Sequence, residues 1–566
     1  MKKLLLSVAI VSFNYIHAQN YFGTEFIGEE GVNSPQGFTK KGNKLVLSSS
    51  IGGGLTGNFP ISFKGGNADG ILTSLNATDG TIEWIKQFGG GGDEVIIDTA
   101  IDDAGNYYVT GYMTGGGSSA MDADPGPGVY LLPIPSALSN RDIFIVKLDA
   151  NGNFLWAKQM STPSGAGNEE ICSIKLDSNG NIYLAGFFIT VDFDPSPLQQ
   201  LYVASGNADA FIVKLTSDGD FIWVKTFGSD TGKISGIKSM DIDESDNIYV
   251  AGRFQGSIDL DPDLVNTDIK TSNGGYDTYL AKYTSEGNYV WGKTYGGKGN
   301  DIPEKILLAK GNLYVGGSFS GEVDLDPSPA NSTYSAPEGQ QAYVSKFDID
   351  GSYLKSFVVE DNTANPNTIK DVFVDDKENI YLSGLFQNMT INATNYSTPY
   401  ANADTFFLKL DQNMNFSSIY LIQGVGKQSV PYINQLTDTK FITAGASKQN
   451  ADFDYTTETS PEVPTNAQIY THITKLDFEK NDLGMVEVKG NKQIDVFPNP
   501  VVDIIHITSQ NKLNVVSIYN LEGKTVMKQD KFDLNQINVS FLPKGVYLLQ
   551  ATDEKGNIHQ AKFIKK

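Results

Sequence analysis

The residues best suited to chemistry in this chain are aspartates that recur in pairs, one residue apart and usually followed by proline. Alternate residues of a β-strand project to one face, so each pair would place two carboxylates together. With loop carbonyls, two carboxylates give the oxygen-rich shell that Ca²⁺ prefers. The candidate calcium ligands are Asp122 and Asp124, Asp192 and Asp194, Asp259 and Asp261 with Asp263, Asp324 and Asp326, and Asp452 and Asp454.

The same aspartates have a second interpretation as turn residues. An aspartate in a turn commonly accepts a hydrogen bond from the backbone two residues further on. The chain also lacks the glycine and distal glutamate of an EF-hand loop. Calcium is the one cofactor that the sequence suggests, and the residues alone leave both interpretations open.

The chain has few residues suited to hydrolase, zinc or phosphate-binding chemistry. A Ser-His-Asp or Cys-His hydrolase needs a histidine near its nucleophile, and a zinc site needs two or three soft ligands. The repetitive part of the chain contains one histidine, His472, and Cys172 is the only cysteine, so no intramolecular disulfide can form. The glycine clusters at 52–54 and 89–92 lack the Lys-Ser/Thr that follows a phosphate-binding loop. We therefore expect a protein that is not an enzyme.

The elements that must position these residues come from an internal repeat. One segment type recurs as Asn-Ile-Tyr-Leu-Ala-Gly and close variants, and weaker copies bring the total to seven, beginning at 44, 106, 181, 247, 312, 379 and 440. A second type, such as Asp-Ala-Phe-Ile-Val-Lys-Leu, begins at 69, 142, 209, 277, 341, 404 and 470. Both patterns are typical of short β-strands.

A hairpin follows most copies of the second segment. Its turn carries a dipeptide ending in glycine, which tolerates the positive φ of a tight turn. The next strand carries tryptophan in four copies, at Trp84, Trp156, Trp223 and Trp291. Each repeat thus supplies about four short strands, the content of one propeller blade.

The repeats predict an all-β, seven-bladed β-propeller closed by pairing N-terminal with C-terminal strands. The region from about 32 to 64 supplies only the first segment type, and 469–488 supplies only the second. Joined, these two regions would complete the seventh blade and leave few sheet edges exposed.

The repeats resemble the bacterial SBBP β-propeller repeat, which reads like Gly-Asn-x-Tyr-Val-x-Gly followed by Asp-x-Phe-Val-x-Lys-Leu and a later tryptophan. The resemblance covers nearly all of residues 30–490, with Lys355 and Ser418 standing where tryptophan is expected. It implies a fold and no particular activity.

The chain changes character after residue 490, where short strands and turns predict a small β-sandwich. This region resembles the type A C-terminal sorting domain of the type IX secretion system, on residues Pro498, Asn499, Pro500, Gly545, Tyr547, Lys562, Lys565 and Lys566. The resemblance implies passage through the periplasm and recognition by the type IX secretion machinery at the outer membrane. An accessory sandwich with an ordinary basic edge is the alternative.

The N-terminus predicts a signal peptide over residues 1–18, with Lys2 and Lys3 before an apolar run from Leu4 to Phe13. No other segment is apolar enough to span a membrane. The expected domains are thus the signal peptide, a propeller over 19–490 and a sorting domain over 491–566, in a protein secreted or held at the outer cell surface.

The formal net charge of −23 bears on possible partners, because a surface this acidic repels nucleic acid and anionic lipid. The leading hypothesis is a monomeric module that binds an extracellular glycan or protein, because a rigid ring offers a loop face and a central funnel. A polysaccharide hydrolase or lyase that uses funnel carboxylates is one alternative. A purely structural protein of the cell-surface layer is another.

Overall fold

The computed structural model describes residues 18–27, 34–53, 61–115, 120–133, 141–161, 169–263, 265–361, 366–398, 402–424, 429–448, 451–452, 469–482, 494–498, 500–509, 512–520, 524–530, 536–553 and 558–566. Nearly all of the predicted signal peptide lies outside these residues. The chain divides into two compact units, Met1–Gly484 and Met485–Lys566. The described residues are all-β, and they include no helix that could cross a bilayer.

The described part of the first unit contains seven groups of four antiparallel strands, here numbered sheets 1 to 7. Sheets 1 to 3 are formed by β2 (Ser34–Lys41), β3 (Lys44–Ile51), β4 (Asp69–Asn76) and β5 (Ile82–Phe88); by β6 (Glu94–Ile101), β7 (Tyr107–Thr114), β10 (Arg141–Leu148) and β11 (Phe154–Met160); and by β12 (Glu170–Leu176), β13 (Ile182–Phe188), β16 (Asp209–Leu215) and β17 (Phe221–Phe227).

Sheets 4 to 6 repeat the same order, and β23 also pairs briefly with β25. Their strands are β18 (Ser235–Ile242), β19 (Ile248–Phe254), β22 (Asp277–Tyr283) and β23 (Tyr289–Gly297); β24 (Asp301–Ala309), β25 (Asn312–Asp324), β26 (Thr333–Asp348) and β27 (Tyr353–Val359); and β28 (Thr368–Val374), β29 (Ile380–Phe386), β32 (Asp404–Leu410) and β33 (Phe416–Gly424).

Sheet 7 joins strands from the two ends of the first unit. It consists of β34 (Ser429–Gln435), β35 (Lys440–Lys448), β37 (Ile469–Asp482) and β1 (Ala18–Ile27). An N-terminal strand therefore does pair with a C-terminal one, but the segments differ from those predicted. Residues 44–51 pair with 69–76 inside sheet 1, and 18–27 is the strand that pairs with β37. The prediction that 32–64 completes the last sheet is wrong, because that region already has its own partners.

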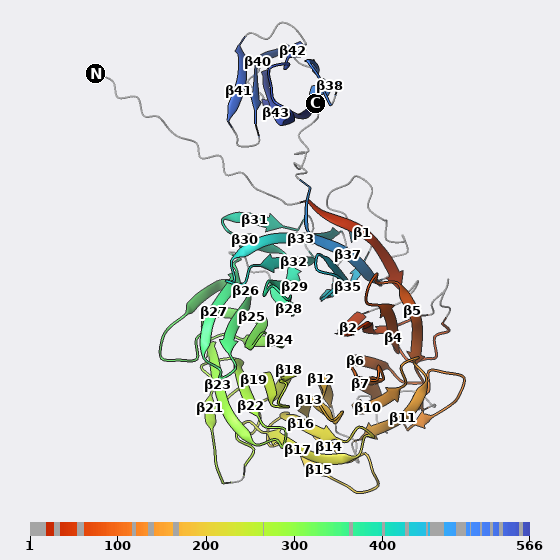
Figure 1. The fold of residues 1–566 in the computed structure, drawn as a ribbon. Coiled ribbons are helices and arrows are strands. Elements are labelled where there is room, and N and C mark those ends of the chain that lie inside the picture. Colours follow the sequence, from red (N-terminus) through yellow and green to blue (C-terminus); the bar gives the residue numbers. More distant parts are fainter. Residues whose placement is uncertain are drawn as a thin grey trace. The chain divides into compact units, whose positions relative to one another are not determined.

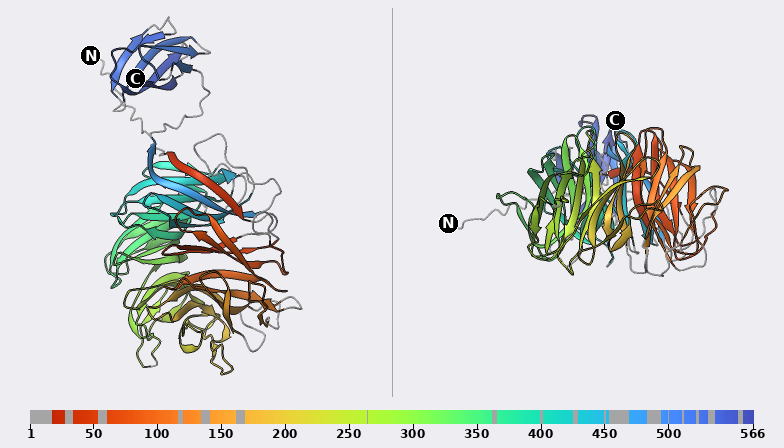
Figure 2. Two further views of the ribbon diagram at one scale, coloured as in Figure 1. Left: turned by 45° about the vertical axis from the view of Figure 1, so that its right-hand side comes forward. Right: turned by 90° about the horizontal axis from the view of Figure 1, so that it is seen from below.

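The first strands of the seven sheets form a cycle of neighbours. β2 contacts β6, β6 contacts β12, and the series continues through β18, β24, β28 and β34 back to β2. Figure 1 shows these strands nearest a common axis and the fourth strands at the periphery. Figure 2 shows the strands of neighbouring sheets lying beside one another.

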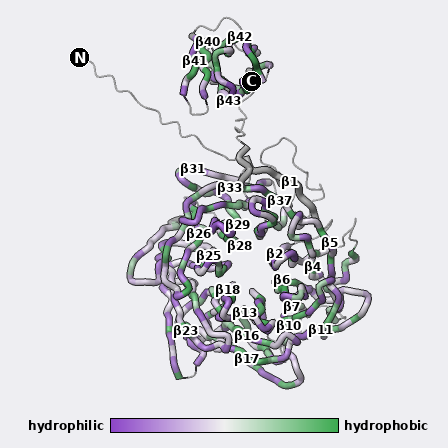
Figure 3. The backbone as a smooth tube through the Cα atoms, in the orientation of Figure 1, coloured by the Kyte–Doolittle hydropathy of each residue, from purple (hydrophilic) through white to green (hydrophobic). Residues whose placement is uncertain are grey.

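The apolar core lies between adjacent sheets. One cluster combines Val46 and Leu72 of sheet 1 with Ile96, Val109 and Phe144 of sheet 2, all fully buried. Equivalent clusters lie between the later sheets. Figure 3 accordingly shows apolar residues distributed over all the sheets. Because each sheet buries its faces against its neighbours, no single sheet holds a core alone.

Small hairpins extend from most sheets onto the sheet before. They involve β8 (Met121–Asp122) with β9 (Leu131–Leu132), β14 (Thr190–Asp192) with β15 (Leu201–Val203), β20 (Ser257–Asp259) with β21 (Ile269–Thr271), and β30 (Asn388–Ile391) with β31 (Thr394–Ser397), while β36 (Ala451–Asp452) pairs directly with β33. Asp122 forms a β-bridge with Gly89 at the end of sheet 1, and Asp192 forms one with Ser161 at the end of sheet 2. These connections tie neighbouring sheets together at the periphery.

The second unit contains two antiparallel sheets that share one core. Ile505 and Ile507 of one sheet pack with Val516 and Leu549 of the other, and all four are buried. The strands are β38 (Ile494–Phe497), β39 (Ile504–Ser509) and β42 (Gln536–Asn538), and β41 (Thr525–Asp530), β40 (Leu513–Tyr519), β43 (Gly545–Asp553) and β44 (Ile558–Lys565).

Candidate functional site

A cavity of about 420 Å³ lies on the axis of the first unit. Its lining comes almost entirely from the first strands of the sheets, among them β2, β6, β12 and β18. The cycle of first strands therefore encloses the candidate binding site.

Each first strand carries a register shift against its second strand at an equivalent place. In sheet 3 the shift lies between Ile171 and Ser173, and in sheet 7 it lies between Ser429 and Tyr432. A bulge of this kind re-aims a side chain. The extra residues of sheets 1 to 6 are all half-buried and all line the cavity: Gln36, Ile97, Cys172, Lys238, Glu304 and Lys370.

Ion pairs between neighbouring sheets surround the cavity. Lys175 Nζ lies 3.2 Å from a carboxylate oxygen of Asp241, and Lys370 Nζ lies 2.9 Å from one of Glu304. Both lysines and Glu304 line the cavity. Within the described residues, no ion pair within 4.0 Å involves the bulge residue Lys238.

Asp98 and Lys305 lie in this lining, and each favours the charged form of the other. Burial raises the pKa of Asp98 above its ordinary value, although Lys175 and Lys305 oppose that rise. Burial opposes the charge on Lys305 as well, but the carboxylates of Asp371, Asp98 and Asp241 together outweigh it and raise the pKa of that lysine. Lys305 Nζ lies 3.5 Å from Asp371 Oδ1. The lining therefore carries charges of both signs.

The two residues considered for nucleophilic or metal chemistry, the half-buried Cys172 and the buried His472, are held in unreactive states. Burial raises the pKa of the Cys172 thiol to about 12, so the thiol stays protonated at neutral pH. Burial lowers the pKa of His472 in β37 to about 3, so its ring is neutral. Neither side chain is therefore prepared for nucleophilic or general-base chemistry at neutral pH.

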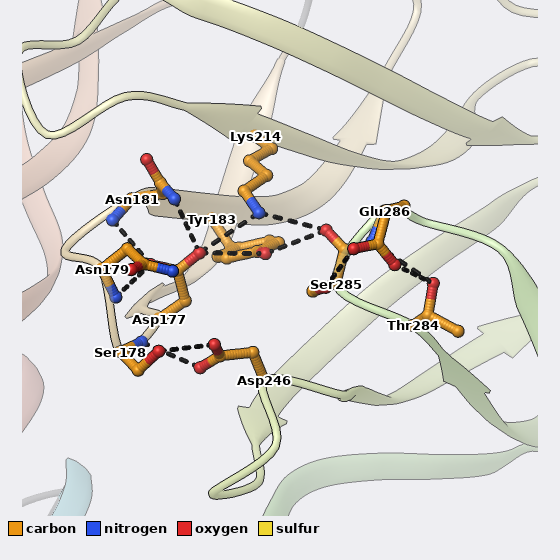
Figure 4. A network of polar contacts seen from close by, with 10 residues as sticks. All are labelled: Asp177, Ser178, Asn179, Asn181, Tyr183, Lys214, Asp246, Thr284, Ser285 and Glu286. Carbon is orange, nitrogen blue, oxygen red and sulfur yellow. Dashed lines mark hydrogen bonds and ion pairs between the residues drawn. The ribbon is translucent and has the colours of Figure 1, made fainter.

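A polar network recurs where the first strand of a sheet turns into the second. In sheet 3, Asp177 accepts hydrogen bonds from the backbone of Asn179 and Asn181 and from the Tyr183 hydroxyl, and Lys214 Nζ lies 3.2 Å from its Oδ2 (Figure 4). Lys214 Nζ also donates to the carbonyl of Ser285 in sheet 4, at 3.1 Å. The repeated Asn, Tyr and Lys of the sequence thus stabilise the frame and link sheets.

The paired aspartates differ from their prediction in one respect, because the two members of a pair do not lie on one strand. The first member ends a short strand or a strand extension, and the second lies beyond it. Asp122, Asp192, Asp259 and Asp324 are the last residues of β8, β14, β20 and β25, whereas Asp124, Asp194, Asp261 and Asp326 lie in the turns that follow. The expectation that both aspartates of a pair lie on one strand is therefore wrong for these four pairs.

The turns instead use these carboxylates as acceptors for backbone N–H groups. Asp192 Oδ1 accepts from the N–H groups of Asp194 and Gln200, at 3.2 and 2.7 Å, and Asp194 Oδ1 accepts from Ser196 N at 2.9 Å. In the other three pairs the first aspartate likewise accepts from the backbone of the second, and the second accepts from a residue two positions further on. These acceptors are Asp122 and Asp124, Asp259 and Asp261, and Asp324 and Asp326.

The turn role of the four pairs is therefore what the structure shows. Among the described residues, no group of three or more His, Cys, Asp or Glu could hold a metal ion. Asp263 is exposed and accepts from Val265 N at 2.8 Å. The side chain of Asp452 and all of Asp454 lie outside the described residues. Calcium binding by any of these aspartates stays a prediction.

One aspartate pair also borders an outer cavity of about 520 Å³. Asp192 and Asp194 line it together with Tyr130 and Trp156. The indole Nε1 of Trp156 is buried and has no hydrogen-bond partner, and the Tyr130 side chain is 44% exposed. An aromatic surface beside carboxylates offers a contact for hydroxyl-rich ligands.

Most of the sorting residues predicted from sequence meet in the second unit. Gly545 pairs with Lys565 across β43 and β44, and Val501, directly after Pro500, forms a bridge with the same Lys565. The backbone N–H of Lys566 donates to the carbonyl of Val501 at 2.9 Å. The chain just after Pro500 therefore lies beside the C-terminal strand.

Tyr547 anchors this arrangement. Its ring stacks on Phe563 with centroids 5.6 Å apart, and its hydroxyl donates to the Pro543 carbonyl at 2.8 Å. Lys562 pairs with Leu548 on the same two strands, and Pro498 is exposed. Asn499 lies outside the described residues. The spacing of these residues in the sequence gave no sign that they would converge.

Comparisons with known proteins cover the two units unequally. An uncharacterized WD repeat-containing protein of Acanthamoeba polyphaga mimivirus is 25% identical over 363 residues, 56% of this chain and 26% of that protein. Beta-agarase D of Zobellia galactanivorans is 33% identical over 73 residues, 13% of this chain and 15% of that protein. A solved protein of unknown function from Dyadobacter fermentans covers 67% of this chain and 93% of its own, with 10% identity and a TM-score of 0.32. The chain thus spans about a quarter or less of the length of the two curated relatives.

The C-terminal residues match a family directly. The model described as "Secretion system C-terminal sorting domain" matches residues 495–566, which contain both sheets of the second unit apart from Ile494. This match supports secretion to the cell surface or exterior. Residues 495–566 belong to the family of C-terminal sorting domains of the type IX secretion system.

Proposed function

We propose that the first unit is a closed seven-bladed β-propeller of SBBP-like repeats that binds an extracellular glycan or protein after export by the type IX secretion system. The cycle of first strands and the pairing of β1 with β37 support closure. In this proposal the seven sheets are the blades. The chain acts as a binding module and not as an enzyme.

The bulge positions around the axis carry this proposal. The frame residues repeat from sheet to sheet, as the Asn-x-Tyr segments and the Asp177-type network do. The bulge positions instead vary among the described sheets, with amide, apolar, thiol, ammonium and carboxylate side chains. A position that varies within a repeated frame is free to take a specific role, and these positions all face one cavity.

A glycan array probed with the purified secreted protein, with and without calcium, tests the binding role. We expect a restricted set of glycans to bind. Lys238→Ala should weaken binding if the ligand enters the axial cavity, and Tyr130→Ala should weaken it if the ligand occupies the outer cavity. Because neither side chain is fully buried, both variants should melt like the unchanged protein. If no glycan and no secreted protein binds, the binding role is contradicted.

The alternative hydrolase or lyase would require a pair of carboxyl groups with separated roles in the axial cavity. Glu170, Glu304 and Asp98 line it. Glu170 and Glu304 are each paired with a cation, Arg141 at 3.0 Å and Lys370 at 2.9 Å, and Asp98 accepts a hydrogen bond from the backbone of Ile174 at 3.1 Å while Lys175 and Lys305 favour its charged form. This pairing favours binding over catalysis. Release of reducing ends from a bound polysaccharide, lost in Glu304→Gln, would favour the enzyme instead.

Export is tested by a chain that ends at Gly484, the boundary between the two compact units. We expect this protein to fold and to accumulate in the periplasm, because the sorting domain is missing while the core of the first unit is intact. Immunoblots of periplasm and medium measure the outcome. Normal appearance of the truncated chain in the medium would contradict type IX export.

A further inference from the structure

Neighbouring sheets meet at a repeated contact near the start of the third strand of one sheet and the first strand of the next. The backbone N–H of Glu94 donates to the Ala68 carbonyl at 2.8 Å, and Asp301 N donates to the Tyr276 carbonyl at 2.6 Å. Each of these backbone bonds makes a repeated position of the third strand and a repeated position of the next sheet's first strand neighbours across the junction. The described pairs at these junctions include Asp69 with Glu94, Asp209 with Ser235, Asp277 with Asp301, and Gln341 with Asn367.

At two of these junctions both side chains are carboxylic acids without access to water. Asp69, Glu94 and Asp301 are 0% exposed, and Asp277 is 1% exposed. In each group one carboxyl oxygen accepts a backbone hydrogen bond, from Lys64 N at 2.7 Å, Gly90 N at 2.9 Å, Asn273 N at 2.9 Å and Gly297 N at 2.7 Å. The other oxygen of each group is buried without a hydrogen-bond partner.

The glycines beside these acids leave no room to separate them. A Cβ on Gly89 would lie 2.7 Å from Asp69 Oδ1, and one on Gly296 would lie 2.5 Å from Asp277 Cγ. The backbone therefore packs directly against both carboxyl groups.

The other two junctions show how the same position is satisfied when only one acid, or none, is present. Asp209 accepts hydrogen bonds from the backbone of Ser205, Gly206 and Ser229 and from the Ser205 hydroxyl. Gln341 donates to the Asp361 carbonyl at 3.0 Å. Neither junction places a second acid opposite the first, so they serve as internal controls.

Two ionised carboxylates with unpartnered oxygens would each bear a buried, unsatisfied charge. A single proton changes this, because a protonated carboxyl donates one hydrogen bond that the other carboxylate can accept. The charged neighbours do not supply the missing partner. Asp93 adds negative charge near Glu94, and Lys64, the cation that favours an ionised Asp69, lies 3.7 Å from Asp122. Asp277 is the one charged group that raises the proton affinity of Asp301.

We propose that the Asp69–Glu94 and Asp277–Asp301 junctions are proton-binding sites, each holding one proton between its two carboxyl groups while the sheets are in contact. Loss of that proton to water as pH rises weakens these two junctions and leaves the Asp209 and Gln341 junctions intact. Among the four junctions, these are the two that a rise in pH weakens. This inference does not depend on what ligand the axial cavity takes.

The direction of the pKa values agrees with the geometry. Burial, and then the charge of Asp69, raises the pKa of Glu94 to about 8, and burial raises the pKa of Asp277 to about 6 and of Asp301 to about 7. Between the ordinary carboxyl pKa of about 4 and these values, the folded protein holds protons that the unfolded chain has lost. Stability therefore falls as pH rises through this window.

Denaturant unfolding of the full secreted chain from pH 5 to pH 9 tests the proposal. Between the unfolded and folded pKa values, each shared proton should make the unfolding equilibrium constant rise by up to about tenfold for each unit of pH. Glu94→Gln with Asp301→Asn should flatten this dependence, because an amide donates to the opposing acid at every pH. Burial also raises the pKa of Asp404 to about 7, so a residual slope from that group is expected in both proteins.

Asp209→Asn is the matched control, since it changes a buried acid at a junction without a second acid and should leave the pH slope unchanged. Equal slopes in the unchanged protein and the double variant would overturn the proposal. A calcium-dependent rise in Tm at pH 9, lost in the double variant, would assign the junctions to a cation and overturn it too. If the double variant does not fold, the infrared band of protonated buried carboxyl groups in an Asp404→Asn protein decides, because Asp404 is itself a buried acid with a pKa raised to about 7. The band should be present at pH 6 and lost by pH 9, and its absence at pH 6 would refute the shared proton.

Discussion

The indole ring of Trp156 in sheet 2 packs against the hairpin backbone of Gly219 in sheet 3. A Cβ built on Gly219 would lie 2.9 Å from Trp156 Cη2, closer than real Cβ contacts. The same relation joins Trp84 to Gly152, Trp223 to Gly287 and Trp291 to Gly351. The repeated tryptophan and the repeated turn glycine are therefore one contact between successive sheets.

Gly219→Ala should destabilise the protein for two reasons. Its φ of +81° strains any residue with a Cβ, by about 1–2 kcal/mol, and the overlap with Trp156 adds about 1–3 kcal/mol. Gly232→Ala is the matched control, because its φ is +79° and nothing lies within 4 Å of its built Cβ. Denaturant unfolding of both variants measures the difference. Equal losses would show that the tryptophan contact contributes nothing.

Asp177→Ala should cost about 3–5 kcal/mol, as expected when one partner of a buried, hydrogen-bonded ion pair is removed. Asp149→Ala is the control, since Asp149 is only half-buried and accepts the same kind of backbone bonds from Asn151 and Asn153 at an exposed turn. The loss of unfolding free energy in Asp149→Ala should be much smaller than in Asp177→Ala. A similar loss in both variants would mean that Lys214 and Tyr183 add little to the turn.

The Asp177 ion pair should also give the protein a specific acid sensitivity. Burial opposes ionisation, but hydrogen bonds from Asn181 and the ammonium of Lys214 hold the pKa of Asp177 below its ordinary value. The stability it contributes is present above the unfolded pKa of about 3.9 and is lost as pH falls through the folded value. The stability gap between the unchanged protein and Asp177→Ala should therefore shrink near pH 3. A gap that is constant from pH 7 to pH 3 would contradict this.

Deleting residues 18–27 should lower the Tm more than ending the chain at Gly484 does. The deletion removes β1 and exposes the backbone edge of β37, whereas the truncation removes a separate compact unit. Calorimetry of the three proteins measures the order. If the protein without β1 has the same Tm as the full chain, the pairing of the two chain ends does not stabilise the first unit.

Changing Asp192 and Asp194 together to Asn should be nearly silent without calcium, because the amide oxygen accepts the same backbone bonds from Asp194, Gln200 and Ser196. If the pairs bind Ca²⁺, chelator should lower the Tm of the unchanged protein. An ion at a hundredfold excess over its Kd stabilises by about 2.7 kcal/mol, and the double variant should lose part of that shift. A Tm indifferent to calcium and chelator would leave these aspartates as turn residues.

The sequence predicts the strands and hairpins well because each is encoded locally. The Asn-x-Tyr and Asp-x-Phe segments became second and third strands, and the turn glycines at 80, 152, 219, 287 and 351 all have positive φ. Which strand completes sheet 7 was not predictable in the same way. Residues 18–27 lack the repeat pattern, and their place is set only by the free edge of β37.

The aspartate pairs show where a local pattern misleads. Alternation along a strand applies only while the strand continues, and Asp124, Asp261 and Asp326 come just after their strands have ended. The proline or turn residue that follows each pair was the signal that the extended backbone stops there. The turn interpretation uses that signal, whereas the one-face interpretation overlooks it.

The axial site was also beyond local patterns. Cys172, Lys238 and Glu304 belong to no motif, and they face one cavity because a bulge recurs at the same place in each first strand. A search for the residue that differs most between aligned repeats would have found them. Likewise, an acid about 25 residues after the Asp that opens a third strand marks the junction pairs, as Glu94 follows Asp69.

Because sheet 7 takes β34, β35 and β37 from the end of the first unit and β1 from its beginning, we expect its assembly to come last in folding. Contacts between residues so distant in sequence form slowly, since the loop-closure entropy comes before any gain from pairing. Six sheets can form in chain order, but sheet 7 cannot be completed until β37, which ends near residue 480, is available to pair with β1. Until then the edge of β1 remains unpaired, and the interval before closure is when a chaperone that binds extended strands would act on this protein.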